Sequence, residues 1–114
     1  ILQRKFEDFE LEKQFLADYT RSTKVVRDDI DRMLIRLYKI SDPTQIDATH
    51  NSKIDSLGFP VYHMETADGY RLYYAYSKTS AKPIHILCHC IKAREKVYFN
   101  KMKNSETLKK KFRN

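Results

Sequence analysis

Two apolar, aromatic-rich runs in the second half of the chain constrain the fold more than any other feature. Residues 70–76 read Y-R-L-Y-Y-A-Y, and residues 83–91 read P-I-H-I-L-C-H-C-I. A short polar connector, from Ser77 to Lys82, separates them. Such runs joined by a short polar segment predict a β-hairpin. We expect the rest of the chain to pack against this hairpin.

Cations gather at one end of the predicted hairpin. Arg71 lies inside the first run, and Lys92, Arg94 and Lys96 follow the second run, with Tyr98 directly after them. Several cations and a phenol at one end of a strand pair are suited to holding a polyanion. Each of these residues also has a purely structural explanation. Arg71 and the basic cluster can lie on a solvent-exposed face of the sheet, and Tyr98 can pack in the core.

Helical spacing precedes the hairpin in two places. Residues 8–19 carry Phe9, Phe15, Leu16 and Tyr19 at spacings that predict a helix. From residue 26 to residue 37, apolar side chains recur at i, i+4, i+7, i+8 and i+11, which predicts an amphipathic helix.

The remaining segments complete the expected topology. Asp42-Pro43 ends the second helix, and the polar residues 44–58 predict a surface loop. We expect a strand from Val61 to Glu65, a turn at Asp68-Gly69, and a short strand continuation toward Phe99. Residues 2–6 fit either an edge strand or the approach to a helix, and residues 104–114 predict a basic helix.

Helices followed by strands predict an α+β fold. We expect one domain over residues 1–114, with an antiparallel sheet of three to four strands packed against two N-terminal helices and followed by a C-terminal helix or tail. Apolar residues make up 41% of the 114, enough for a single core.

Charge and cysteine content limit the partners and the compartment. The formal net charge of +7 favours an anionic partner, which could be a nucleic acid, an acidic protein or a membrane surface. The apolar runs are far shorter than the ~20 residues of a membrane span, and the opening ten residues lack the apolar core of a signal peptide. Two cysteines form no disulfide framework, so we expect a cytoplasmic protein.

Two motifs resemble those of a known family. G-Y-R-L-Y-Y at residues 69–74 and K-A-R-E-K-V-Y at residues 92–98 are similar to the RelE/ParE superfamily of bacterial toxins, and to the RelE-like ribonucleases in particular. The resemblance implies a RelE-like fold and a toxin that cuts messenger RNA on the ribosome. The implied partners are messenger RNA, ribosomal RNA and a cognate antitoxin protein.

The resemblance also implies a reaction and its residues. The RNA 2′-hydroxyl attacks the adjacent phosphate, with neither metal nor cofactor. Arg71 and Lys92 match family positions that contact the phosphate, and Arg94 matches a further basic position. Tyr98 matches an aromatic residue that stacks on the base or orients the nucleophile.

The general base is where this chain departs from the family. RelE-like strands often carry lysines before the G-Y-R motif, whereas this chain has His63 and Glu65. Either could act as the base, since His63 has a reference pKa of about 6.5. Both point to one face of their strand, and the sequence leaves open which face that is.

Further cations and a histidine extend the expected RNA contact. These candidate RNA-binding residues are Lys96, Lys101, Lys103 and His89.

A metal site is not favoured by the Cys and His residues of the second run. Alternation puts Cys88 and Cys90 on one face and His85 and His89 on the other, so they cannot form one tetrahedral site. We expect both cysteines to be buried core residues. Most tyrosines of the first run are also expected to pack in the sheet.

Two other functions stay open on the same scaffold. One is a ParE-like inhibitor of DNA gyrase that cuts no RNA, and the other is a non-catalytic RNA- or protein-binding module.

Overall fold

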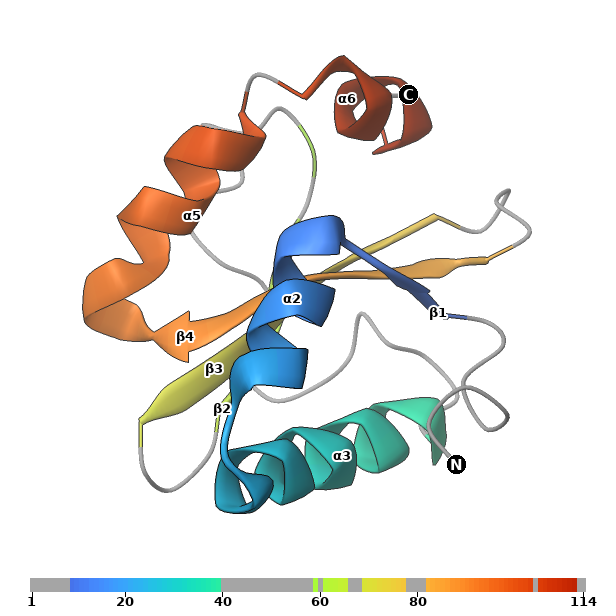
Figure 1. Ribbon diagram of the computed structural model, residues 1–114. Helices are drawn as coiled ribbons and strands as arrows, with labels where there is room; N and C mark the ends of the chain where they lie inside the picture. The colour runs from blue at the N-terminus through green and yellow to red at the C-terminus, as the bar shows by residue number, and fades with distance from the viewer. Residues whose placement is uncertain are drawn as a thin grey trace.

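The computed structural model describes residues 9–39, 59, 61–65, 69–77, 82–103 and 105–112. The order of elements is β1 (Phe9–Leu11), α2 (Lys13–Arg21), α3 (Lys24–Lys39), β2 (Tyr62–Glu65), β3 (Tyr70–Tyr76), β4 (Ile84–Ile91), the short 3₁₀ helix η2 (Lys92–Arg94), α5 (Glu95–Met102) and α6 (Glu106–Phe112) (Figure 1). This arrangement is the α+β fold that the sequence predicts.

The β3–β4 hairpin forms the centre of the sheet. The strands lie in the order β1-β4-β3-β2, and β2 and β4 are each antiparallel to β3, as predicted. The edge strand β1 is parallel to β4, with Phe9 opposite Ile84. A parallel pair needs a long crossover connection, which the helices and strands between β1 and β4 supply.

Strand β1 replaces the first turn of the expected N-terminal helix. Phe9 was expected on a helical stripe with Phe15, but it lies in β1 and is 4% exposed. The helix begins only at Lys13. Pairing with the open edge of β4 satisfies backbone groups of residues 9–11 that a helix would otherwise satisfy, so the tertiary contact overrides the local spacing.

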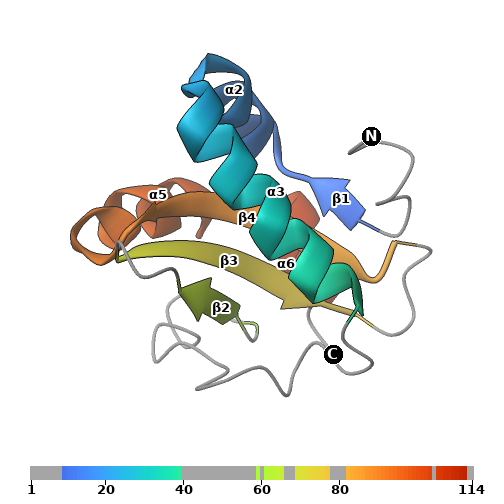
Figure 2. The ribbon, with the colours of Figure 1, turned by 90° about the horizontal axis from the view of Figure 1, so that it is seen from below.

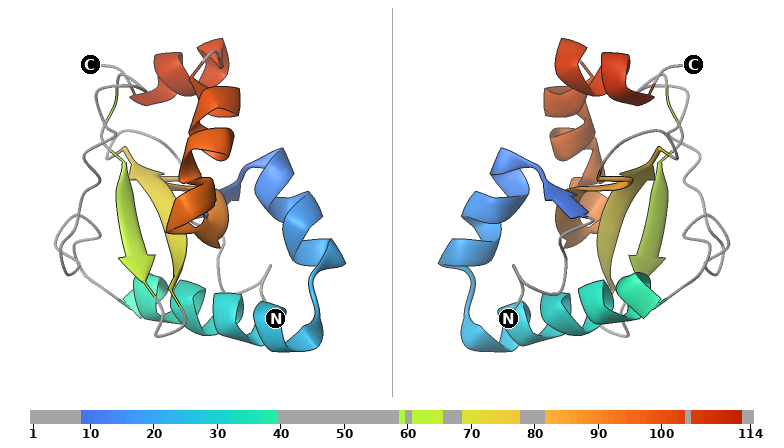
Figure 3. Two further views of the ribbon diagram at one scale, coloured as in Figure 1. Left: turned by 90° about the vertical axis from the view of Figure 1, so that its left-hand side faces the viewer. Right: turned by 90° about the vertical axis from the view of Figure 1, so that its right-hand side faces the viewer.

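Helices cover both faces of the sheet, whereas the sequence indicated one covered face. Helices α2 and α3 pack on one face, which we call the α3 face, and α5 and α6 pack on the opposite one, the α5 face (Figures 2 and 3). Both faces are covered because β3 alternates large apolar residues in both directions: Leu72 and Tyr74 toward α3, Tyr73 and Ala75 toward α5.

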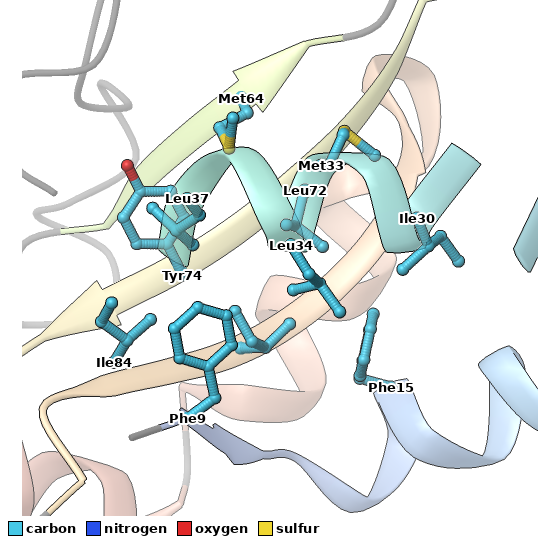
Figure 4. Close-up of a cluster of buried hydrophobic side chains, with 11 residues drawn as sticks. Phe9, Phe15, Ile30, Met33, Leu34, Leu37, Met64, Leu72, Tyr74 and Ile84 are labelled. Atoms are coloured by element: carbon cyan, nitrogen blue, oxygen red, sulfur yellow. The ribbon is translucent and has the colours of Figure 1, made fainter. Parts of the chain in front are cut away.

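The α3 face holds the core that Figure 4 shows in close-up. The apolar stripe of α3 predicted from its spacing is confirmed, with Ile30, Met33, Leu34 and Leu37 all buried. The core cluster of this face consists of Phe9, Phe15, Ile30, Met33, Leu34, Leu37, Met64, Leu72, Tyr74, Ile84 and Ile86.

A β-bulge in β4 changes the direction of its side chains. Tyr73 lies opposite Cys88, but the next residue lies opposite Ile86, so Leu87 is the extra residue. Before the bulge, His85 contacts Phe112 on the α5 face, with ring centroids 5.7 Å apart. After it, His89 lies on the α3 face. The prediction that these two histidines share a face is therefore wrong.

The segment after β4 is helical and not the expected strand continuation. Phe99 and Met102 lie three residues apart on α5 and are both buried against the α5 face. Helix α6 confirms the predicted C-terminal helix, with Leu108 and Phe112 buried one turn apart. Residues 2–6, the loop 44–58 and Asp42-Pro43 lie outside the described residues.

Candidate functional site

Arg71 lies on β3 and points to the α5 face. Its Nε atom donates to Glu65 Oε1 at 2.9 Å, and only 18% of its side chain is exposed. Burial alone would lower the pKa of Arg71, but hydrogen bonding with Tyr73 and the carboxylate of Glu65 raise it overall. A largely buried guanidinium with one carboxylate partner is a cation held in one position.

The two candidate bases lie beside Arg71, which answers the question that strand alternation leaves open. Glu65 is opposite Arg71 in the β2–β3 register, and His63 is opposite Tyr73. The His63 and Tyr73 rings are 5.9 Å apart. His63 and Glu65 therefore share the α5 face with Arg71.

Glu95 completes this polar cluster and was missed in the sequence. It is 6% exposed, and its Oε2 atom accepts a hydrogen bond from the Tyr73 hydroxyl. Burial and then the Glu95 hydrogen bond raise the pKa of Tyr73, so the phenol stays protonated. The sequence signal for Glu95 was a single acidic residue inside the basic run K-A-R-E-K. Glu95 stands at the start of a helix, where the helix dipole favours a carboxylate.

Removing the Tyr73 hydroxyl should destabilise the protein through Glu95. Tyr73→Phe removes a hydrogen bond to a buried carboxylate, which costs about 1–3 kcal/mol. Urea unfolding at pH 7 measures this loss. Tyr76→Phe on the same strand is the matched control, since Tyr76 is only half-buried. Equal stability of the two variants would contradict the structural role of Glu95.

A groove lies where the hairpin ends and α5 begins. We call it the end groove; its cavity volume is about 280 Å³ and its lining residues are Tyr70, His89, Cys90, Ile91, Arg94 and Tyr98. Tyr70 and His89 stack in parallel, with ring centroids 4.9 Å apart. The groove thus brings together three residues that the sequence singled out, His89, Arg94 and Tyr98.

Tyr98 and His89 are both uncharged in this groove at neutral pH. The Tyr98 hydroxyl donates to Asp18 Oδ2 on α2 at 3.2 Å. Burial, followed by the nearby Asp18 carboxylate, raises the pKa of Tyr98 to about 12. Burial lowers the pKa of His89 below its ordinary value, so the ring is neutral and able to accept a proton.

Cys90 lines the end groove and lies opposite Arg71 on the neighbouring strand. A hydrogen bond from Cys88 lowers the pKa of Cys90 against the effect of burial, and Arg94 and Arg71 act in the same direction. Arg71 lies opposite Cys90 in the β3–β4 register, and Arg94 lines the end groove together with Cys90. Both cysteines are buried free thiols, as expected.

The other predicted basic residues lie outside this groove. Lys92 is exposed on η2, and Lys96, Lys101 and Lys103 are exposed along and after α5. They extend the positive charge of the surface beside Arg94 without lining the groove.

Within the described ranges, no three His, Cys, Asp or Glu side chains gather closely enough to hold a metal ion. No helix in the same part of the chain has the length and apolar character needed to cross a membrane.

No family model and no curated protein matches the sequence. Among solved structures, the fold is similar to that of the Escherichia coli toxin RelE, in a free-state form with two arginines replaced by alanine. The TM-score is 0.60 at 14% sequence identity, and the match covers 83% of this chain and 90% of the other. The chain therefore has a RelE-like fold.

Proposed function

We propose that this chain is the toxin of a toxin–antitoxin pair and acts as a ribosome-dependent endoribonuclease on messenger RNA. One observation carries the proposal: Arg94, Tyr98 and His89 converge on one groove at the end of the hairpin. Arg71 lies opposite Cys90, a lining residue of this groove, and the scaffold is similar to that of a toxin.

The side chains around the groove suit cleavage by the RNA's own 2′-hydroxyl. That reaction needs a base at the 2′-hydroxyl, cations at the phosphate and an acid at the leaving 5′-oxygen. Arg71 and Arg94 supply guanidinium groups, which bind phosphate oxygens in a fork. The base comes from His63, Glu65 or the neutral His89. Tyr98 stays protonated and orients the nucleophile or stacks on a base.

The exposed lysines provide the docking surface for RNA. Lys92, Lys96, Lys101 and Lys103 extend the basic surface along η2 and α5, and the formal net charge is +7. Binding to ribosomal RNA through such cations weakens as salt rises. A protein that acts on translating ribosomes works in the cytoplasm. A cognate antitoxin would cover the end groove.

The test is inducible expression of this chain in a bacterium, with primer extension on a reporter messenger RNA. We expect growth arrest and cuts within the translated codons. A reporter without its start codon is the matched control, and it should stay intact if cleavage needs the ribosome. Arrest with intact messenger RNA would point instead to gyrase inhibition, and neither arrest nor cuts would indicate a binding-only protein.

A further inference from the structure

The two cysteines of β4 point to the same face of the sheet but differ in what they can meet. Cys88 and Cys90 both belong to the core cluster of the α5 face, and both are free thiols. Cys88 is 0% exposed, whereas Cys90 is 5% exposed and lines the end groove. A small molecule that enters the groove therefore reaches Cys90, while Cys88 stays enclosed in the core.

Two cations stand beside Cys90. Arg71 is directly opposite it on β3, and directly opposite residues of an antiparallel pair have their Cβ atoms about 4.5–5.5 Å apart. Arg94 lines the end groove together with Cys90. The Glu95 carboxylate opposes the two guanidinium groups, since it raises the pKa of Cys90 while they lower it. Neighbouring cations favour the thiolate, which is the reactive form of cysteine.

Cys88 supports the thiolate of Cys90 through a hydrogen bond. Its thiol donates to the Cys90 sulfur, and this bond is the main reason why the pKa of Cys90 falls in spite of burial. The same bond, followed by burial, raises the pKa of Cys88, so Cys88 keeps its proton. The pair therefore has fixed roles, with Cys88 as the donor and Cys90 as the thiol that ionises more readily.

From this arrangement we propose that Cys90 is a redox modification site, at which hydrogen peroxide converts the cysteine to its sulfenic acid. The Cys90 thiolate attacks one peroxide oxygen, so that an S–O bond forms while the O–O bond breaks. The second oxygen leaves as hydroxide and takes a proton from solvent to become water. The sulfur loses two electrons and the peroxide gains them, and thiol reductants reverse this first step of cysteine oxidation. Hydrogen peroxide is small enough to enter the end groove, which has a volume of about 280 Å³.

The sulfenic acid is the expected end product, because Cys88 is badly placed to close a disulfide with it. Residues two apart in a β-strand have Cα atoms about 6.8 Å apart, at the upper limit of the distances that disulfides span. Cys88 also stays protonated, whereas only a thiolate attacks an oxidised sulfur. Oxidation therefore adds one oxygen atom to the lining of the end groove, beside Arg94.

Oxidation at Cys90 would regulate the proposed RNA cleavage, and this consequence rests on the proposed function. The added oxygen accepts hydrogen bonds, so it competes with a phosphate for the guanidinium groups beside it. We expect hydrogen peroxide to slow messenger RNA cleavage and a thiol reductant to restore it. In Cys90→Ser, the peroxide should no longer change the cleavage rate.

The oxidation itself is tested without RNA. The full chain is treated with hydrogen peroxide at pH 7 in the presence of dimedone, which traps sulfenic acids, and peptide mass spectrometry locates the adduct. We expect the adduct on Cys90 and not on Cys88, and we expect it to form roughly tenfold faster in the folded chain than in the urea-unfolded chain. Because no RNA takes part, this result does not depend on the proposed function.

Variants of the neighbouring residues test their roles. Cys88→Ala removes the donor and should slow the trapping at Cys90 roughly tenfold, whereas Cys88→Ser keeps a donor and should retain most of the rate. Arg94→Ala should also slow it, while Arg32→Ala removes an exposed cation of α3 and is the matched control. A thermal melt checks that each variant is folded. An adduct on Cys88, a disulfide between the two cysteines, or a Cys90 that reacts no faster in the folded chain than in the unfolded one would overturn the proposal.

Discussion

Arg71→Ala should lower the rate of messenger RNA cleavage by about 10²- to 10³-fold, the usual effect of removing one group that stabilises developing charge. Negative charge grows on the phosphate as the 2′-hydroxyl attacks. Arg71 is held in place by Glu65 and Tyr73, so its charge is already positioned when the RNA arrives. The measurement is the cleavage rate in a purified translation system, supported by primer extension in cells.

Two controls separate a role at the phosphate from a structural role. Arg71→Lys keeps the charge but loses the planar fork, so it should retain only part of the activity. Arg32→Ala removes an exposed cation of α3 and should leave cleavage unchanged. Because Arg71 is only 18% exposed, a thermal melt of Arg71→Ala is needed to measure how much stability its loss costs. Full cleavage by Arg71→Ala would refute the assignment, and a fall in melting temperature that parallels the loss of activity would make Arg71 structural.

Leu34→Ala should lower the free energy of unfolding by about 2–5 kcal/mol, since a fully buried leucine is replaced by a cavity. Leu34 is 0% exposed and packs in the centre of the α3-face core (Figure 4). A domain of this size is stable by only about 5–15 kcal/mol, so the variant should unfold at a markedly lower urea concentration. The measurement is the urea concentration at the midpoint of unfolding, compared between variants whose unfolding free energy depends on urea with the same slope.

Leu16→Ala is the matched control for this loss. Leu16 lies on α2 and is 46% exposed, so its removal should change stability by less than about 0.5 kcal/mol. If Leu34→Ala were no more destabilising than Leu16→Ala, helix α3 would not pack on the sheet in the way that the structure indicates.

The elements with strong periodicity were predictable from the sequence. The spacing of Ile30, Leu34 and Leu37 predicted α3, and the structure buries all three. The hairpin followed from its two apolar runs. The state of residues 9–11 was not predictable, because Phe9 stands at a helical spacing of seven residues from Leu16 and yet lies in β1. The strand forms because residues 9–11 pair with the edge of β4, which would otherwise be open.

The site was only partly predictable for the same reason. The sequence named Arg71, Arg94, Tyr98, His63 and Glu65 as candidates, and the structure places them around the end of the hairpin in two adjacent groups. Glu95 was overlooked because an acidic residue within a basic run is usually exposed on the surface. Its burial depends on Tyr73, which lies on another element.

The sequence by itself determined the helices and strands with clear periodicity, the α+β class and the basic charge after the hairpin, since each depends on neighbours within a few residues. Tertiary structure decided the rest. The bulge at Leu87 sends His85 and His89 to opposite faces, and the bond between Tyr98 and Asp18 joins residues 80 positions apart. Local spacing carries no information about such contacts, because they exist only once the sheet has brought distant segments together.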